Sequence, residues 1–476
     1  MARYFKFHSL DDLAAECRQL GLDLRFSEDF SPLFQPAAVG PLRVGNRLCI
    51  QPMEGCDGTL DGRPDELTFR RYRRFGAGGA KLLWGEATAV IEEGRANPRQ
   101  LLINDQTASD LERMLRDCRR AHREAFGSDD DLVVGLQLTH SGRYSYHRPL
   151  IAFHDPILDP RTVADRATGR VVDADYPLLD DDYLRRLPDH YVAAARLAWR
   201  IGFQFVDIKQ CHRYLLNELL AAKTRPGPYG GSLENRTRLA REIFTRIRDE
   251  VPGLVIATRL NVFDCIPFRK RPGSDAGEPC PWTAPVLSAW GTREDDPLTP
   301  DLTEPAWWIG EMARLGVALV NISMGNPYAV MHVIRPFEYP PPDGYEPPEH
   351  PLIGVDRHVR LAGQLQQMYP DLPMVGSGYS YLQEFFPHAG AANVRDGRIT
   401  FVGAGRASLP LPDFARQLRE QGRLERKRVC RTFSYCTALM RAKHNELGQF
   451  ATGCPPFDKE VYGPIWEQAK KPPPPA

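Results

Sequence analysis

Short, mostly apolar segments rich in β-branched residues recur along the chain and predict a parallel β-sheet. We count eight of them, at residues 47–53, 81–88, 132–140, 203–210, 254–260, 317–324, 372–377 and 399–404. Most are continuously apolar, whereas a half-exposed strand would alternate between apolar and polar residues. A continuous pattern is typical of strands that are buried on both faces.

Amphipathic segments between these strands predict helices. They cover residues 107–126, 187–201, 233–251, 303–316 and 355–369. A shorter helix is expected over residues 9–22, with Ser9 as its N-cap and Gly21 at its end. Eight strands alternating with helices predict an α/β protein with a (β/α)8 barrel. A doubly wound open sheet is the alternative, and the barrel is favoured because no GxGxxG motif follows an early strand.

Three regions are expected along the chain. They are an N-terminal helical extension over 1–30, the barrel over 31–425, and a C-terminal extension over 426–476 that ends in "KKPPPPA", a tail expected to be disordered. Two long connections, residues 264–300 and 325–353, each follow a predicted strand. In a barrel both would lie at the carboxyl ends of the strands, where active sites are built.

Composition and charge argue against several classes of protein. The 61 Lys and Arg residues balance the 61 Asp and Glu residues, whereas a protein that coats nucleic acid needs a basic excess. No apolar run approaches the roughly 20 residues that span a bilayer, and "MARYFKFHSLDDLAAECRQ" does not resemble a secretory signal. The 10 scattered cysteines fit a reducing compartment. We therefore expect a cytoplasmic protein that acts on a small molecule, and homo-oligomerisation stays open.

Polar side chains stand where the predicted strands end. Lys209, His212 and Tyr214 follow the fourth strand. The other strand-end residues of interest are Pro52, Met53, Glu54, Glu86, Ala87, Thr88, Gln137, His140, Arg143 and Arg259. Any one of them alone is more often a loop anchor. Because the carboxyl ends of barrel strands surround one mouth, the whole set predicts a polar ligand there.

Two glycine-containing loops follow the last two predicted strands. They are "VGSGYS" at 375–380 and "VGAGRASL" at 402–409. Glycine allows backbone N–H groups to approach a phosphate, and the start of a helix adds a favourable dipole, although glycine can also serve only a tight turn. Barrels often bind phosphate after strands seven and eight. The residues expected to hold a phosphate are Gly376, Ser377, Gly378, Gly405 and Arg406.

Several motifs together resemble the old yellow enzyme family of FMN-dependent oxidoreductases. They are "NRLCIQPM" (46–53), "GGAKLLWGEATAV" (78–90), "GLQLTHSGR" (135–143), "YLLNELLAAKTRPGPYGGSLENRTR" (214–238), "VGSG" (375–378) and "GAGR" (403–406). They occur in the family's order across roughly residues 33–410. The block "YGGSLENR" is the most specific of them.

The resemblance implies that FMN binds across the barrel mouth and that NAD(P)H supplies the electrons. The residues that would contact the flavin ring are Pro52, Met53, Glu54, Ala87 and Gln137. Arg259 would lie near the N1/O2 edge of the ring and stabilise the anionic reduced form. Gly378, Gly405 and Arg406, with the neighbouring backbone, would hold the phosphate.

The resemblance also implies roles for the residues after the fourth strand. Tyr214 would protonate the carbon α to an activating group, while the flavin delivers hydride to the β carbon of the C=C bond. His212 stands where the family places one of two residues that bind the substrate's carbonyl oxygen. The other is usually histidine, and here it is Lys209. A lysine still donates hydrogen bonds, and its full charge, unless burial lowers its pKa, favours a carboxylate or another anionic substrate.

Glu54 is a second departure from the family, which often has Thr or Cys at this position. A carboxylate beside the flavin would disfavour the reduced anion unless it is protonated or paired. Lys209 or a loop arginine could be that partner.

The cysteines near the C-terminus argue against an iron–sulfur cluster. Relatives of the 2,4-dienoyl-CoA reductase and trimethylamine dehydrogenase type carry a four-cysteine site after the barrel. This chain offers Cys430, Cys436 and Cys454, and Phe433 stands where the second cysteine would fall. A [4Fe–4S] cluster takes four thiolates, so no cluster and no other metal is expected. Because the sequence ends at residue 476, we expect the further domains of those relatives to be absent, which again favours NAD(P)H as the electron donor.

Two other functions stay open from the sequence. Lys209 could form a Schiff base with a carbonyl substrate, as in an aldolase-like lyase. Alternatively, the protein binds FMN but has lost catalysis through its departures at Lys209 and Glu54.

Overall fold

The computed structural model describes residues 4–471, and a closed barrel of eight parallel strands forms its centre. The strands are β3 (Leu48–Ile50), β4 (Leu82–Ala89), β5 (Val133–Thr139), β6 (Phe205–Ile208), β7 (Val255–Asn261), β10 (Val317–Ser323), β11 (Met374–Gly376) and β12 (Phe401–Ala404). Pairing of β12 with β3 closes the barrel. The eight predicted strands and the (β/α)8 fold are therefore confirmed, and the open-sheet alternative is wrong.

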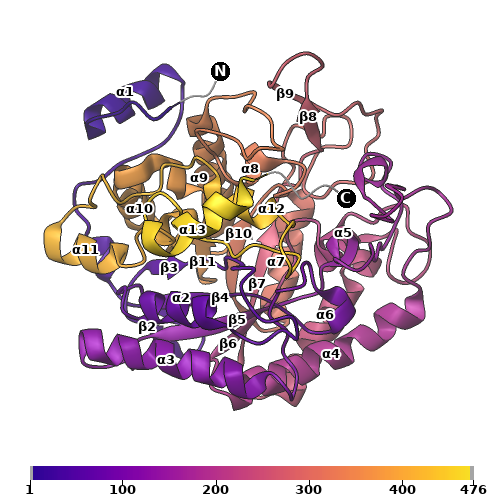
Figure 1. Cartoon of the computed structure of the whole chain (residues 1–476), viewed down its shortest axis with the longest axis horizontal. Helices are drawn as coiled ribbons and strands as arrows, with labels where there is room; N and C mark the ends of the chain where they lie inside the picture. The colour runs from indigo at the N-terminus through magenta and orange to yellow at the C-terminus, as the bar shows by residue number, and fades with distance from the viewer. Residues whose placement is uncertain (1–3, 472–476) are drawn as a thin grey trace.

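Helices surround the strands (Figure 1). The predicted ones are α3 (Ala108–Phe126), α4 (Asp181–Arg200), α6 (Leu233–Glu250), α7 (Thr303–Arg314) and α9 (Pro351–Met368). The prediction began α4 too late, because its first turn is polar and is capped by the Asp180 carboxylate, which accepts from Tyr183 N at 2.7 Å. Helices without a prediction are α2 (Glu66–Gly76), α5 (Leu215–Leu220), α10 (Phe386–Arg395), α11 (Phe414–Gln421), α12 (Tyr435–Arg441) and α13 (Lys459–Ala469).

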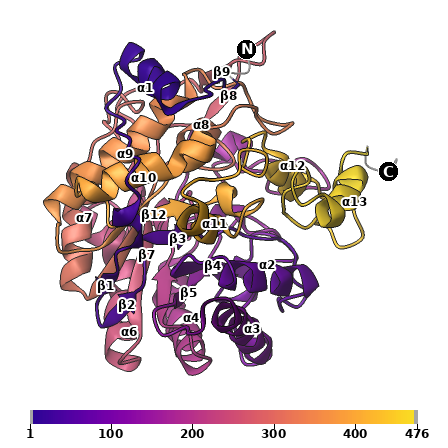
Figure 2. The same cartoon turned by 90° about the vertical axis from the view of Figure 1, so that its left-hand side faces the viewer.

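The N-terminal helix α1 (Leu10–Gln19) lies at the edge of the molecule (Figures 1 and 2). Its N-cap is Ser9, as the sequence predicts. Ser9 Oγ accepts from Asp12 N at 3.1 Å, and the Asp12 carboxylate accepts from Ser9 N at 3.1 Å. This reciprocal pair satisfies two backbone N–H groups that the helix itself cannot bond.

Apolar side chains fill the amino-terminal half of the barrel interior. The strands supply Cys49, Leu82, Trp84, Val133, Phe205, Val255, Ala257, Leu319, Val375 and Phe401. A hairpin of β1 (Ala37–Val39) and β2 (Leu42–Val44) packs against this set through Val39 and Val44. The hairpin closes the amino-terminal end, so the polar residues lie at the opposite, carboxyl end.

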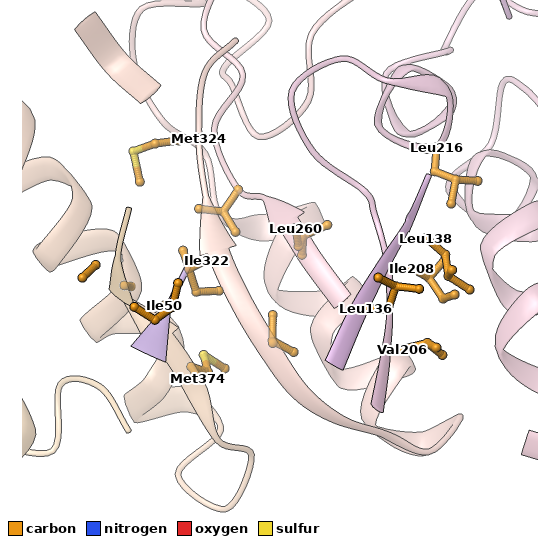
Figure 3. Close-up of a cluster of buried hydrophobic side chains, with 14 of the residues drawn as sticks. Ile50, Leu136, Leu138, Val206, Ile208, Leu216, Leu260, Ile322, Met324 and Met374 are labelled. Carbon is orange, nitrogen blue, oxygen red and sulfur yellow. The ribbon is translucent and has the colours of Figure 1, made fainter. Parts of the chain in front are cut away.

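The outer faces of the strands pack against the helices. Figure 3 shows this layer, with Ile50, Leu136, Leu138, Val206, Ile208, Leu260, Ile322 and Met374 among its buried side chains. Every residue of β4 and β5 is buried. Burial on both faces explains why the strands are continuously apolar in the sequence.

The two long connections contain short elements that the sequence did not predict. The first forms a two-stranded antiparallel sheet of β8 (Phe268–Lys270) and β9 (Gly277–Pro279). The second contains α8 (Met331–Ile334). It brings Tyr328 and Arg335 to the cavity at the barrel mouth, which agrees with the position expected for a loop that follows a strand.

The C-terminal segment folds back over the barrel mouth, next to α2 (Figure 2). Asp458 forms ion pairs with Arg70 at 2.7 Å and with Arg74 at 2.6 Å. Thr452 N donates to Gly55 O at 2.7 Å. The expected three-region division stays a prediction, and residues 472–476 of the proline-rich tail lie outside the described residues.

Among residues 4–471, no helix combines the length and the apolar character needed to cross a bilayer.

Candidate active site

A cavity of about 1200 Å³, including its opening to solvent, lies at the carboxyl ends of the strands. The predicted site residues that line it are Pro52, Met53, Glu54, Ala87, Gln137, Lys209, His212, Tyr214, Arg259, Ser377, Gly378, Gly405 and Arg406. Gly376 is buried within β11 and does not line the cavity. Its carbonyl oxygen accepts a hydrogen bond from Gln51 Nε2 at 3.3 Å. The structure therefore brings together side chains from strands that are far apart in the sequence.

The floor of the cavity is organised around the buried carboxylate of Asp207. This carboxylate accepts from Trp84 Nε1 at 2.7 Å, from Gln137 Nε2 at 2.5 Å and from Arg259 N at 2.7 Å. Burial raises the pKa of Asp207, although these three donors oppose the rise. The bond to Asp207 uses the amide nitrogen of Gln137. Its carbonyl oxygen is left to accept an N–H group from a ligand.

Arg259 gives this end of the cavity a positive charge. Its Nε is buried and has no hydrogen-bond partner within residues 4–471. Burial lowers the pKa of Arg259, and the neighbouring Cys211 and Asp207 oppose this shift. A cation that is incompletely paired favours a ligand with a negatively charged or electron-rich edge.

Two more arginines meet at the end of the cavity that holds the glycine loops. Arg335 Nε and Nη2 and Arg406 Nη1 are buried without a partner in the described part of the chain. Burial, and then the charges of Arg406 and Arg441, lower the pKa of Arg335 to about 9. Adjacent guanidinium groups with unused donors fit a phosphate dianion. The sequence does not predict Arg335 as a site residue, because it lies in a proline-rich connection without a recognisable motif.

The backbone also comes close to the cavity at this end. A Cβ at Gly403 would lie 1.9 Å from Gln51 Nε2. Gly378 has φ +90°, and a Cβ there would lie 2.6 Å from the His358 ring. Only glycine fits both positions, and backbone that lacks side chains is what close approach to a phosphate requires.

A strained turn presents the side chains that follow β6. His212 and Arg213 have φ +66° and +61°, in the left-handed region that non-glycine residues seldom adopt. Arg213 holds this turn through buried ion pairs with Asp155 at 2.6 Å and Asp264 at 3.2 Å. The turn ends at Tyr214, the N-cap of α5. The chain therefore turns its polar side chains toward the cavity before the helix begins.

Lys209, His212 and Tyr214 form one wall of the cavity. Lys209 Nζ lies 3.7 Å from the centroid of the Tyr214 ring, and His212 Nε2 lies 2.9 Å from Ser323 Oγ. Burial lowers the pKa of Lys209 to about 8, while Cys211 and then Glu54 oppose the shift. Burial, with the charges of Arg259 and Lys209, lowers the pKa of His212 well below 6.5. At neutral pH the wall therefore presents a neutral imidazole beside a cation.

Glu54 differs from its expected pairing. Its carboxylate accepts from Asn97 Nδ2, and no ion pair with Lys209 or a loop arginine is formed among residues 4–471. Burial raises the pKa of Glu54 to about 7, and the charge of Lys209 opposes the rise. Asn97 occupies the hydrogen-bonding position, and Lys209 acts on Glu54 through its charge without a direct bond. The carboxyl is nevertheless close to half protonated at neutral pH.

Three tyrosines lie together at the edge of the cavity. The hydroxyls of Tyr214 and Tyr328 are 3.0 Å apart, and the Tyr328 ring stacks on Tyr144 at 4.3 Å between centroids. Asn326 donates to the Tyr144 hydroxyl at 2.8 Å and accepts from Tyr328 N at 2.7 Å. Tyr144 and Tyr328 were not predicted as site residues, because no pattern links these two loops in the sequence.

Four other polar strand-end residues do not line the cavity. Thr88 donates to Glu86 O at 3.2 Å, and the other three are loop anchors. Glu86 accepts from Arg71 Nη2 at 2.5 Å, His140 Nε2 lies 2.8 Å from the Tyr183 hydroxyl, and Arg143 bonds Glu218 at 2.6 Å. At these three positions, the expectation that a single strand-end residue anchors a loop describes the side chain correctly.

The cysteines of the C-terminal segment surround a smaller, neighbouring cavity of about 440 Å³. Cys430, Cys436, Cys454 and Phe433 line it, and Arg406 and Cys436 border the main cavity as well. No group of three or more His, Cys, Asp or Glu side chains within residues 4–471 is placed to hold a metal ion. The absence of an iron–sulfur cluster stays a prediction.

More than half of the chain matches the model of one known protein family. The model of the NADH:flavin oxidoreductase / NADH oxidase family matches residues 32–281. The chain belongs to this family. The resemblance to old yellow enzymes that the sequence motifs indicated is confirmed.

Two curated relatives illustrate the similarity of this family member. The NADPH dehydrogenase of Halalkalibacterium halodurans is 31% identical over 223 residues, which cover 45% of this chain and 59% of that protein. An NADH:flavin oxidoreductase of Gibberella zeae is 29% identical over 236 residues, or 46% of this chain and 54% of that protein. The matched region thus spans little more than half of either relative.

Solved structures of other proteins share the fold of this family member. The complex of 2-naphthoyl-CoA reductase with 2-naphthoyl-CoA has a TM-score of 0.64 at 19% identity, covering 92% of this chain and 58% of the other. The old yellow enzyme homologue of Zymomonas mobilis has a TM-score of 0.57 at 20% identity, covering 84% and 96%. Morphinone reductase in complex with tetrahydroNAD has a TM-score of 0.57 at 19% identity, covering 83% and 92%.

Proposed function

We propose that this protein is an FMN-dependent oxidoreductase that uses NAD(P)H to reduce an activated C=C bond or a related electron-poor substrate. The observation that carries the proposal is the cavity itself, whose lining includes three arginines with buried guanidinium nitrogens that have no partner within residues 4–471. Relatives with the name NADPH dehydrogenase, and a related fold solved with tetrahydroNAD, support NAD(P)H as the donor.

The cavity residues fit FMN in charge and in shape. Arg335 and Arg406 would bind its phosphate together with the backbone around Gly378 and Gly405. The residues that would contact the flavin ring are Pro52, Met53, Glu54, Ala87, Gln137 and Arg259. When bound, FMN would supply the hydride chemistry. The charge of Arg259 would stabilise negative charge at the edge of the ring.

The wall formed by Lys209, His212 and Tyr214 would bind the substrate. Lys209 and His212 would donate hydrogen bonds to an oxygen of its electron-withdrawing group, where negative charge develops. Tyr214 would give its hydroxyl proton to the α carbon. Its O–H bond breaks as the C–H bond forms, and the Lys209 charge 3.7 Å from the ring would stabilise the phenolate that is left.

We expect the purified protein to contain tightly bound, non-covalent FMN. Heat or acid denaturation should release it for chromatography. Arg335→Leu and Arg406→Leu should each weaken FMN binding by about 10- to 100-fold, because each removes a charged donor to the phosphate. Riboflavin, which has no phosphate, should bind both variants as it binds the wild type.

The matched control is Arg360→Leu on α9, a half-exposed arginine outside the cavity. It should leave FMN affinity unchanged. Release of FAD, or of no flavin at all, would contradict the proposal. Equal losses of FMN and riboflavin affinity would show that the two arginines do not bind the phosphate.

Anion binding at the substrate wall should weaken as the pH rises. Lys209 is positive below its pKa of about 8, and Glu54 is neutral below its pKa of about 7. Raising the pH removes the attracting charge and adds a repelling one. The dissociation constant of benzoate, which is ionised throughout, should rise about tenfold between pH 7 and pH 9. Flavin absorbance changes on titration measure it.

Two variants test the origin of this pH dependence. Glu54→Gln should remove the change in the benzoate dissociation constant near pH 7. Lys209→Met should remove the change near pH 8. A wild-type dissociation constant that does not vary with pH would show that neither group faces the bound anion.

A Schiff-base lyase is the second candidate function. A specific observation favours it, since burial lowers the pKa of the Lys209 amine to about 8 and a neutral amine is the nucleophile in such enzymes. Trapping of a carbonyl substrate on Lys209 with borohydride would support the lyase. A protein without flavin would also favour the lyase over the oxidoreductase.

A further inference from the structure

The proposed proton donor is shielded from solvent, whereas its hydrogen-bond partner is not. Tyr214 is 4% exposed and Tyr328 is 38% exposed. Their hydroxyls lie 3.0 Å apart, within hydrogen-bonding distance. Tyr214 must regain a proton after every turnover, and a substrate in the cavity would cover its cavity side. Tyr328 lines the main cavity and also a second one, beside Asn97 and Lys443, which gives its side chain a contact with solvent outside the substrate position.

Tyr328 is held firmly in this position. Asn326 Oδ1 accepts from Tyr328 N at 2.7 Å and from Ala329 N at 3.1 Å. Asn326 Nδ2 also donates to His212 O at 3.1 Å, which joins this loop to the turn before Tyr214. The Tyr328 ring also stacks on Tyr144 at an interplanar angle of 26°, so the side chain is held as well as the backbone. An exposed tyrosine without a role would not need such support.

We propose that Tyr328 relays protons from solvent to Tyr214, an inference that rests on the proposed reduction of an activated alkene. The Tyr214 O–H bond breaks as its proton forms the new C–H bond. The Tyr328 hydroxyl then gives its proton to the Tyr214 oxygen, and Tyr328 takes a proton from water or a buffer acid. The net transfer is one proton from solvent to the substrate carbon. Phenols with a pKa near 10 or above hold their protons at neutral pH, so both hydroxyls are protonated before the reaction begins.

A purely structural role of Tyr328 makes a different prediction. Packing on Tyr144 needs the aromatic ring, whereas the relay needs the hydroxyl. Tyr328→Phe keeps the ring and removes only the hydroxyl, so it separates the two roles. The test uses the whole flavin-loaded protein with NADPH and 2-cyclohexenone, and with ferricyanide as an acceptor that takes electrons without protonation at carbon.

We expect Tyr328→Phe to lower turnover with 2-cyclohexenone by about tenfold, less than loss of the direct donor costs. Ferricyanide turnover and reduction of the flavin by NADPH should not change. Added imidazole, a small buffer acid, should restore turnover with cyclohexenone in the variant without affecting the wild type. In mixtures of H2O and D2O, the wild-type rate should depend non-linearly on the deuterium fraction, because two protons move, and the variant should respond linearly.

The matched control is Tyr339→Phe in the same connection, at a side chain that is 49% exposed and outside the cavity. It should leave both activities unchanged. Unchanged cyclohexenone turnover in Tyr328→Phe would overturn the relay, and so would a loss that imidazole does not restore. If the wild type fails to reduce ferricyanide with NADPH, the proposed function itself is wrong, an outcome that differs from both of these.

Discussion

Replacing Tyr214 with phenylalanine is expected to slow reduction of an activated alkene by about 10²- to 10⁴-fold, the usual cost of losing a positioned general acid. Burial, with contributions from Tyr328 and Glu54, raises the pKa of Tyr214 well above its usual value of 10, so at neutral pH the side chain carries the proton it would donate. Phenylalanine keeps the ring that lies under Lys209 and removes only the hydroxyl that carries this proton.

Stopped-flow measurement of the two half-reactions checks the effect. Oxidation of the reduced flavin by the alkene should carry the whole loss, and flavin reduction by NAD(P)H should stay nearly constant. Equal losses in both half-reactions would mean that Tyr214 supports the structure of the site and does not donate a proton.

Removing either of the two proposed oxygen-binding side chains is the second large expected effect. Lys209→Met and His212→Ala should each reduce turnover by about 10²- to 10³-fold, because fixed donors act mainly where charge develops in the transition state. Methionine keeps the bulk of the lysine stem. The double variant should lose less than the product of the two effects, because both donors bind one oxygen.

A phenolate ligand gives an independent measurement of the same contacts. Its long-wavelength charge-transfer band with the flavin should be lost in both single variants, while the FMN content stays constant. If Lys209→Met leaves ligand affinity and turnover unchanged, the amine serves only to cover the Tyr214 ring, and the substrate is bound by His212 alone.

The sequence predicted the barrel well because its strands are buried on both faces. Segments such as 132–140 and 317–324 are continuously apolar, whereas strands that are exposed on one face alternate between apolar and polar residues. Barrel topology then places the end of each strand at one mouth, so the sequence alone groups Gln137, Lys209 and Arg259. The helices that were missed are mostly short or follow loops, where periodicity gives a weak signal.

The remaining site residues could not be predicted for physical reasons. Arg335 and Tyr328 lie in an irregular connection, and only the tertiary fold determines which of its side chains reach the cavity. The direct partner of Glu54 is Asn97, a loop residue that no spacing rule singles out. The left-handed turn at His212 depends on ion pairs that Arg213 makes with distant carboxylates, and these are invisible in a local sequence window.

The wall that residues 436–452 add to the cavity has a consequence for local unfolding of the chain. Cys436, Thr437, Met440 and Thr452 border the same space as Met53, and Asp458 fastens their segment to Arg70 across 388 positions of the sequence. A segment held by only a few contacts opens before the core does. The ring of strands can thus be complete while the cavity still lacks a side. A molecule that touches both Met53 and Met440 would tie the last part of the chain to the first, so occupancy of the cavity would itself protect the C-terminal segment from proteolysis.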